Sequence, residues 1–229
     1  GVHEDGGMRE YVTFPARYLH RSEALSYEQL ALVEPLGIGC HAVNRARVTA
    51  DDTVLVIGAG PIGLGAMQFA QAAGAPVIAM DVNPDRLAFC RETLQLAGTV
   101  DAREEAEAPL RRHFDGDLPT IVFDATGNPA SMMKAFDYVA HGGTLVYLGL
   151  FQGDVQFHDP LFHRKELTLM ASRNALGSEF RHIIHAIETG RIETAPWITH
   201  QVAFDAMIDH FDAWLRPETR VIKAMVAVT

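Results

Sequence analysis

Residues 53–66, TVLVIGAGPIGLGA, constrain the fold more than any other stretch of the chain. An apolar run of strand length leads into Gly58, Gly60 and Gly63, which have the spacing G-x-G-x-x-G, and the residues that follow can begin a helix. In such a unit the first glycine permits a tight turn, the second lets a pyrophosphate approach the backbone, and the third allows close helix–strand packing. The stretch therefore predicts a nucleotide-binding turn. The alternative is a glycine-rich turn that binds no ligand.

Apolar segments of strand length alternate with helical patterns from Thr53 onward. The predicted strands are Thr53–Ile57, Pro76–Met80, Thr99–Val100, Thr120–Phe123, Thr144–Leu148 and Leu167–Met170. The predicted helices between them are Pro61–Ala73, Pro84–Leu94, Glu104–His113 and Ala130–Val139. Strands that are apolar on both faces indicate a parallel sheet covered by helices on both sides. We predict an α/β fold with a doubly wound parallel (Rossmann) sheet, which binds its ligand beyond the carboxyl ends of the strands.

The segments that flank this pattern predict further elements. Arg9–Phe14 is rich in β-formers and predicts a short strand, and Ser26 fits the N-cap of a helix. Pro35 can open a second helix, which places Glu34 at a break between two helices. The C-terminal part predicts helices Ser178–Thr189 and Phe204–Leu215 and a closing strand Val221–Val228.

Asp81 comes directly after the second predicted strand, 18 residues after Gly63. A carboxylate there can accept hydrogen bonds from both ribose hydroxyls of an adenosine and repels a 2′-phosphate, which favours NAD over NADP. Arg86 can cover the adenine face, or it can pair with a phosphate. A methyltransferase that uses S-adenosylmethionine would have a similar glycine turn and acid, so these residues alone leave the class open.

The other candidate cofactor-binding residues lie at the start of the first helix of the sheet and after later strands. In a parallel sheet these strand ends converge on one crevice, although each segment is also consistent with simple turn chemistry. The candidates are Pro61, Ile62, Ala125, Thr126, Leu148, Gly149, Leu150, Arg173 and Asn174.

The charge and the cysteines restrict the partners and the compartment. A formal charge of −10 argues against a nucleic acid or an anionic membrane as partner, while a local site for a small anion is still compatible with it. Cys40 and Cys90 form neither a disulfide framework nor a zinc-finger pattern. No apolar run has the length of a membrane helix, and the N-terminus lacks the apolar region of a signal peptide. We therefore expect a cytoplasmic protein.

Taken together, several segments carry a resemblance to a known family. They are GGMREYVTFPARYLH (6–20), LALVEPLGIGCHAV (30–43), VLVIGAGPIGLGAMQFAQAAGA (54–75), MDVNPDRL (80–87), FDATGN (123–128) and GGTLVYLG (142–149). In this order the chain resembles the medium-chain zinc-dependent alcohol and polyol dehydrogenases, especially the sorbitol, threonine and sugar-acid dehydrogenase branch. The resemblance implies oxidation of a secondary alcohol of a polyol, sugar or sugar acid, with NAD and zinc as cofactors.

The family's first domain, a GroES-like catalytic domain, is not matched in full. Its G-H-E motif and four-cysteine zinc lobe do not occur, so the resemblance implies a remnant of that domain at 1–30, the NAD-binding domain at 31–190 and a returning segment at 191–229. Of the residues around the family's zinc only Glu34 is matched, and the catalytic residues are unknown. We therefore expect this chain alone to hold no zinc and to be inactive. The alternative function is that of a non-catalytic nucleotide-binding module.

The resemblance also implies a homodimer or homotetramer, formed through an edge of the sheet. We expect Thr144–Leu148 and Leu150–Phe157 to build this edge, with Leu167–Met170 beside it. The run LVYLGLF is apolar and uncharged, and natural monomers avoid exposing such an edge. The alternative is an interior strand that is covered on both faces, which would give a monomer.

Overall fold

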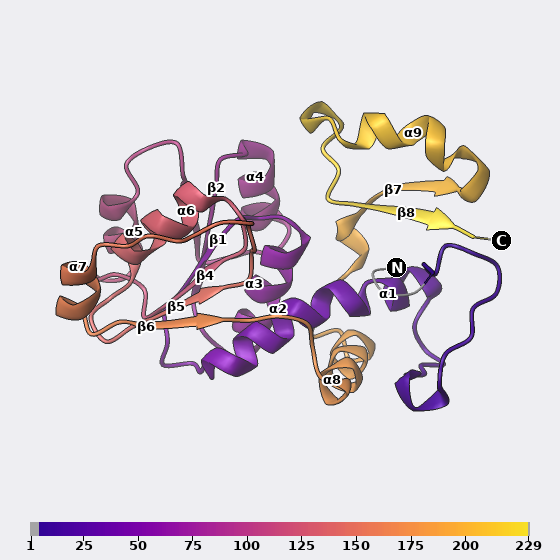
Figure 1. Ribbon diagram of the computed structural model, residues 1–229, viewed down its shortest axis with the longest axis horizontal. Coiled ribbons are helices and arrows are strands. Elements are labelled where there is room, and N and C mark those ends of the chain that lie inside the picture. The colour runs from indigo at the N-terminus through magenta and orange to yellow at the C-terminus, as the bar shows by residue number, and fades with distance from the viewer. Residues whose placement is uncertain (1–4, 229) are drawn as a thin grey trace.

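A parallel six-stranded sheet forms the centre of the computed structural model, which describes residues 5–228 (Figure 1). The strand order is β3-β2-β1-β4-β5-β6, and every neighbouring pair is parallel. This is the order of a doubly wound dinucleotide-binding fold, so the predicted fold class is confirmed. The strands are β1 (Val54–Ile57), β2 (Val77–Asp81), β3 (Gly98–Asp101), β4 (Ile121–Asp124), β5 (Thr144–Tyr147) and β6 (Thr168–Ala171).

Several helices begin where the sequence supplies a cap. Ser26 accepts the backbone N–H of Gln29 at the start of the first helix, while Asn83 and Asn128 cap helices that have proline at the first position. The helices are α1 (Tyr27–Ala31), α2 (Val33–Ala46), α3 (Pro61–Ala72), α4 (Pro84–Glu92), α5 (Glu107–His113), α6 (Pro129–Lys134), α7 (Asp159–Arg164), α8 (Gly177–Glu188) and α9 (Met207–Trp214). Short 3-10 helices lie at Ala16–Tyr18, Ala135–Tyr138, Ala195–Trp197, Phe204–Ala206 and Pro217–Thr219.

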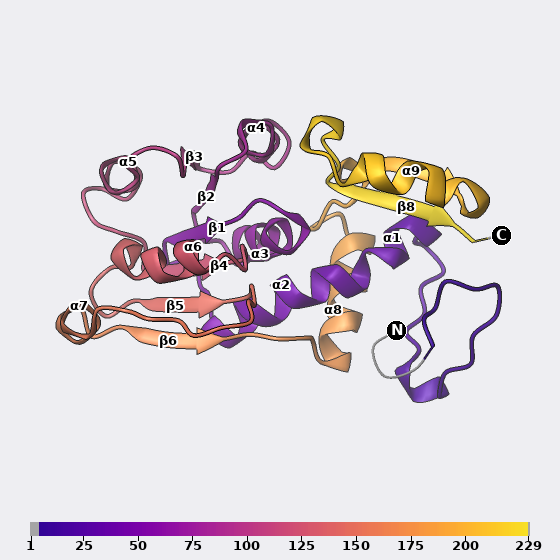
Figure 2. The same cartoon turned by 45° about the horizontal axis from the view of Figure 1, so that its top comes forward.

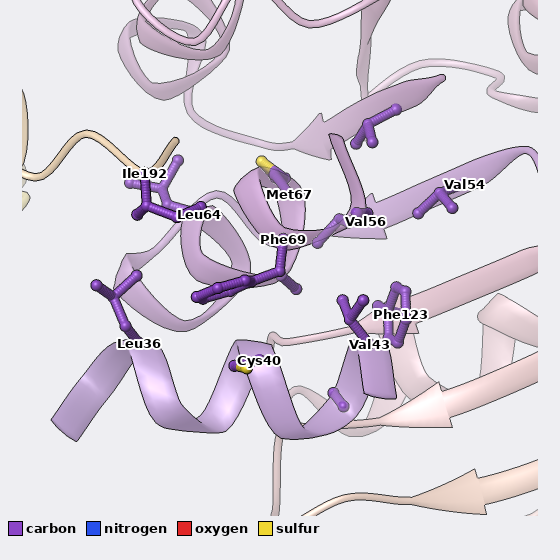
Figure 3. Close-up of a cluster of buried hydrophobic side chains, with 14 of the residues drawn as sticks. Leu36, Cys40, Val43, Val54, Val56, Leu64, Met67, Phe69, Phe123 and Ile192 are labelled. Carbon is purple, nitrogen blue, oxygen red and sulfur yellow. The ribbon is translucent and has the colours of Figure 1, made fainter. Parts of the chain in front are cut away.

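Two apolar clusters cover the two faces of the sheet. Along β1, Val54 and Val56 join one cluster with α2, α3 and α8, whereas Leu55 and Ile57 join the other with α5 and α6. Figure 3 shows side chains of the first cluster meeting between α2, α3 and the sheet. Because successive strand residues point to opposite faces, continuous apolar strands are required when both faces are covered.

Helices α2 and α3 approach each other closely at Gly39. A Cβ atom on Gly39 would lie 2.4 Å from the backbone nitrogen of Ala66 and 2.5 Å from the carbonyl carbon of Gly65. Only glycine allows this approach, so the two helices are in backbone contact at that point.

A small C-terminal lobe, residues 198–227, consists of β7 (Ile198–Ala203), α9 and β8 (Lys223–Ala227). The two strands are parallel and form a separate two-stranded sheet. Figures 1 and 2 show this lobe beyond the end of α4, on the side toward which the strands of the main sheet point. The sequence analysis predicted α9 and β8 but did not identify β7.

Three expectations about individual segments are wrong. Arg9–Phe14 forms no strand, because residues 5–15 have no regular structure. The break between the first two helices lies at Leu32, and Glu34 is exposed in the first turn of α2. Leu150–Phe157 forms no strand, and β5 lies between β4 and β6. The edge strand on that side of the sheet is therefore β6, and β5 is an interior strand.

Within residues 5–228, no helix has the length and apolar character needed to cross a membrane.

Candidate functional site

The carboxyl ends of five strands lie side by side at one edge of the sheet. The first residue after β1, β4 and β5 donates its N–H to the neighbouring strand: Gly58 to Met80 at 2.8 Å, Ala125 to Ile57 at 2.8 Å, and Leu148 to Asp124 at 2.8 Å. Ser172 continues this row by donating its N–H to Tyr147 at 2.9 Å. The predicted candidates from β1, β2, β4, β5 and β6 are therefore brought to one edge, as the parallel sheet required.

The glycine turn between β1 and α3 has almost no room for side chains. Gly58 has a φ of +96°, a conformation that favours glycine. A Cβ on Gly63 would lie 1.8 Å from the carbonyl oxygen of Gly58, and one on Gly60 would lie 3.1 Å from Nη1 of Arg86. The turn thus brings the N-terminus of α3 against β1 and leaves its backbone open to a ligand, with the Arg86 guanidinium beside it.

Asp81 faces this turn and also holds its backbone in place through hydrogen bonds. Its Oδ2 accepts the N–H of Ala59 at 2.6 Å, and its Oδ1 accepts the N–H of Asn83 at 2.8 Å. Each carboxylate oxygen can accept more than one hydrogen bond, so both oxygens keep capacity for ligand hydroxyls. The sequence analysis predicted the ligand role of Asp81 but missed its role in holding the turn.

A cavity of about 550 Å³ opens beside this turn. Six predicted residues line it, namely Gly58, Gly60, Asp81, Arg86, Ala125 and Thr126. Residues that the sequence analysis did not single out complete it: Ile57, Met80, Val82, Ala102, Asn128, Ala130, Ser131, Lys134 and Tyr138. Most of the latter follow a strand end or lie on α6 and the 3-10 turn after it. For the residues from Ala102 onward, the distance in sequence from the glycine turn explains why their part in the cavity was not predicted.

A larger cavity, of about 650 Å³, lies between α4 and the C-terminal lobe and shares Asp81, Val82 and Arg86 with the first. It does not include the glycine turn. We assign the candidate site to the smaller cavity, because that one contains the backbone that can receive a phosphate group.

Asp124 is fully buried at the end of β4 and holds the next turn. Its carboxylate accepts the N–H of Thr126 at 2.9 Å, the hydroxyl of Thr126 at 2.7 Å and the hydroxyl of Ser131 at 2.7 Å. The sequence analysis placed the segment Asp124–Gly127 at the crevice but did not assign to Asp124 the role of holding the turn. The pattern D-x-T with a serine seven residues after the aspartate was the available signal.

The remaining candidates lie outside the cavity. Pro61, Ile62 and Gly63 form the first turn of α3, beside the glycine turn. Leu148, Gly149 and Leu150 pack against the turn after β4, where a Cβ on Gly149 would lie 2.2 Å from the nitrogen of Gly127. Arg173 and Asn174 are exposed on the loop after β6, at the same edge of the sheet but four strands away from Asp81.

Neither cysteine offers a reactive thiolate. Burial raises the pKa of the Cys90 thiol to about 12, and the negative charge of Asp81 adds to this effect. Burial, together with the charge of Glu179, likewise raises the pKa of Cys40 to about 12. The chemistry of this edge therefore does not include a cysteine nucleophile.

Within residues 5–228, no group of three or more His, Cys, Asp or Glu side chains is placed to hold a metal ion. Glu34 lies one helical turn before Gly37, whose Cβ position would be 2.9 Å from Cβ of Ala175 on the loop after β6. The side chains of this part of the chain therefore do not by themselves fit a metal centre.

The glycine turn does fit a dinucleotide, because its backbone is open at a helix N-terminus and the carboxylate of Asp81 is close by. A protein family model described as zinc-binding dehydrogenase matches residues 61–189, which is more than half of the 229-residue chain. The chain belongs to the zinc-binding dehydrogenases. The resemblance stated from the sequence is thereby confirmed.

Curated relatives of this zinc-binding dehydrogenase act on sugar acids and polyols, according to their names. L-galactonate-5-dehydrogenase of Escherichia coli (strain K12) is 38% identical over 226 residues, which are 99% of this chain and 66% of the relative. L-arabinitol 4-dehydrogenase of Hypocrea jecorina is 30% identical over 227 residues, which are 96% of this chain and 60% of the relative. The chain thus spans about two thirds or less of the length of these relatives.

Solved structures show the same fold. An NAD-dependent alcohol dehydrogenase superposes with a TM-score of 0.85 at 24% identity, covering 99% of this chain and 66% of the other. A protein of E. coli CFT073 described as a short chain alcohol dehydrogenase, solved with the cofactor NADH, has a TM-score of 0.81 at 24% identity and covers 89% and 60%. At this level of identity the likeness concerns the fold alone.

Proposed function

We propose that this chain binds NAD(H) and is the cofactor-binding part of an enzyme that oxidises a secondary alcohol of a polyol, sugar or sugar acid. The observation that carries the proposal is the glycine turn with Asp81 beside it, at the edge where five strand ends meet. The names of the curated relatives support the reaction class. An isolated nucleotide-binding module without a catalytic partner is not favoured, because both relatives are named as dehydrogenases.

The residues of this chain would bind and orient the cofactor. The partly exposed backbone of Gly60 and the N-terminus of α3 would receive the pyrophosphate, and Asp81 would accept the ribose hydroxyls. NAD supplies a hydride acceptor when bound. Leu148, Gly149, Leu150, Arg173 and Asn174 would contact the part of the cofactor farthest from Asp81.

The preference for NAD over NADP follows from charge. A 2′-phosphate would face the Asp81 carboxylate, which already organises the turn and cannot move away without losing two hydrogen bonds. The compensating cation closest to the glycine turn is Arg86, which lies beside Gly60. Calorimetric titration with NADH and NADPH tests this, and equal affinities would contradict the role of Asp81.

L-Galactonate and L-arabinitol are the first substrates to test, because the names of the relatives point to them. We expect the chain on its own to turn over neither, since zinc catalysis needs about three protein ligands and the described residues offer Glu34 without partners. Zinc therefore belongs to the proposal for the complete enzyme. Zinc-dependent formation of NADH by this chain alone, or one zinc per chain after dialysis, would show that the ligand set has been misjudged.

We further propose a homodimer or homotetramer that is formed through β6. This strand is an edge of the sheet, three of its four residues are exposed, and Leu169 presents 39% of its surface to solvent. An uncovered parallel edge offers backbone groups to a second copy.

The buried, unpaired thiols of Cys40 and Cys90 are consistent with a reducing, cytoplasmic compartment.

A further inference from the structure

A buried carboxylate joins α2 to the start of α8. Glu179 lies in the first turn of α8 and exposes 6% of its surface. Its carboxylate faces Nδ1 of His41 at 3.0 Å and accepts a hydrogen bond from Nδ2 of Asn44 at 2.9 Å, both from α2. It also accepts the backbone N–H of Leu176 at 2.7 Å. We call His41, Asn44 and Glu179, with this N–H, the Glu179 cluster.

Burying the carboxylate of the Glu179 cluster costs free energy of folding, and this cost indicates that the cluster has a function. Burial opposes the ionised carboxylate and raises its pKa, but the hydrogen bonds from the Leu176 N–H, Asn44 and His41 outweigh burial and lower the pKa of Glu179 overall. An apolar residue would pack α8 against α2 without this arrangement. What the carboxylate adds is a directed hydrogen bond to one backbone group, the N–H of Leu176.

Leu176 ends the loop that follows β6. The loop begins at Ser172, which is fixed by its hydrogen bond to Tyr147, and its middle is close to α2, where the Cβ position of Gly37 would be 2.9 Å from Cβ of Ala175. Asn174 has a φ of +60°, in the left-handed region that few residues other than glycine adopt. The Glu179 cluster holds the far end. In Figures 1 and 2, α8 lies beside α2.

The exposed residues of this loop are Arg173, Asn174 and Leu176, and its strand lies four positions along the sheet from that of Asp81. With strands about 4.8 Å apart, the loop is roughly 19 Å from Asp81. It therefore lies at the opposite end of the candidate crevice from the adenosine site proposed above.

We propose that Glu179 is a positioning residue, which through His41 and Asn44 fixes the loop 172–176 so that this loop contacts the nicotinamide end of the bound cofactor. The inference rests on the proposed function. The proposal gives α2 a role that the glycine turn and Asp81 do not reveal. His41 and Asn44 of α2 would hold the far end of the crevice through the carboxylate of Glu179 on α8, which itself does not contact the cofactor.

The test compares two ligands that share the adenosine end of the crevice. NADH and ADP-ribose are titrated against the full chain by calorimetry, with the wild type, Glu179→Ala, Glu179→Gln and His41→Gln. Removal of a buried, charged hydrogen-bond acceptor should weaken NADH binding about tenfold in Glu179→Ala. ADP-ribose, which lacks the nicotinamide, should bind within about twofold of the wild type, because a twofold change is well under 1 kcal/mol. Glu179→Gln retains one acceptor oxygen, so the difference between its effects on NADH binding and on ADP-ribose binding should be smaller.

Gln68→Leu is the matched control. Gln68 is as buried as Glu179, at 6% exposure, and it also makes two hydrogen bonds to backbone, with the carbonyl oxygen of Glu193 at 2.8 Å and its N–H at 3.1 Å. Its hydrogen-bond partner lies outside the loop 172–176. This control should lower thermal stability and leave the ratio of NADH to ADP-ribose affinity unchanged.

The outcomes separate the inference from the proposed function. If the wild type binds neither ligand, the proposed function fails. If the wild type binds both and the Glu179 and His41 variants change both affinities equally, or neither, the positioning role is wrong. If Glu179→Ala does not fold, Glu179→Gln and His41→Gln decide the matter by the same ratio.

Discussion

Gly63 and Gly65 are two residues apart on α3 and offer a matched pair of substitutions. A Cβ on Gly63 would lie 1.8 Å from the carbonyl oxygen of Gly58, whereas one on Gly65 would be 3.6 Å from its nearest neighbour, Cδ2 of Leu36. Both substitutions add the same methyl group to the same helix. Their effects should therefore differ only through the space around them.

The expected magnitudes follow from these distances. Contacts of Cβ atoms below 3.0 Å essentially do not occur, so Gly63→Ala must move α3 away from the turn by about 1.2 Å, the difference between 3.0 and 1.8 Å. Such overpacking costs about 1–3 kcal/mol. Gly65→Ala makes ordinary contacts, and the gain of up to about 1 kcal/mol from helix propensity is common to both substitutions. The two variants should therefore differ by about 2 kcal/mol in free energy of unfolding, which is the middle of the overpacking range.

Thermal unfolding and NADH titration measure the pair. For a chain of this size about 2 kcal/mol corresponds to melting temperatures about 4–8 °C apart. Gly63→Ala should also weaken NADH binding, because the N-terminus of α3 moves away from the turn, while Gly65→Ala should leave binding unchanged. Equal melting temperatures, or a Gly63→Ala variant that binds NADH as the wild type does, would refute the proposed geometry of the turn.

Three further predictions follow from the site and the sheet. Asp81→Ala should narrow the gap between NADH and NADPH affinity and lower stability by about 2 kcal/mol, since two backbone N–H groups lose their acceptor; calorimetry and denaturant unfolding would show both. Leu169→Lys should shift a dimer toward monomer in sedimentation velocity, and a wild type that is monomeric at micromolar concentration would remove the proposal for β6. The pKa of Glu179 is lowered from its usual 4.5, so its ionised form stabilises the fold above that pH and this contribution is lost as pH falls through the lower folded value. The difference in unfolding free energy between the wild type and Glu179→Gln should accordingly shrink in acid, and a difference that stays constant as the pH falls would contradict this assignment.

The central sheet could be predicted from the sequence because every strand carries its own signal. Continuous apolar runs such as Val54–Ile57 and Val77–Asp81 are needed on a sheet that is covered on both faces, and this requirement is local. β7 could not be predicted in this way. Its sequence, ITHQVA, has a weak pattern, and its partner β8 comes only after α9 along the chain.

The residues of the candidate site also include some that the sequence could predict and some that it could not. Gly58, Gly63 and Asp81 were predictable because their spacing along the chain reflects one strand–turn–helix–strand unit. The roles of Asp124 and Glu179 in holding loops were not predicted, because what distinguishes these carboxylates is burial together with several donors. For Glu179 the donors on α2 are separated from it by 138 and 135 residues. No local pattern contains that pairing.

The backbone contact between α2 and α3 has a mechanical consequence. At Gly39 the two helices touch without side chains between them, so sliding of one helix past the other would bring backbone atoms into collision at this point. We therefore expect Glu34 at one end of α2 and the glycine turn at the start of α3 to move together. Movements that open or close the crevice are then expected in the segments around this helix pair, with little change in the distance from the Glu34 backbone to the glycine turn.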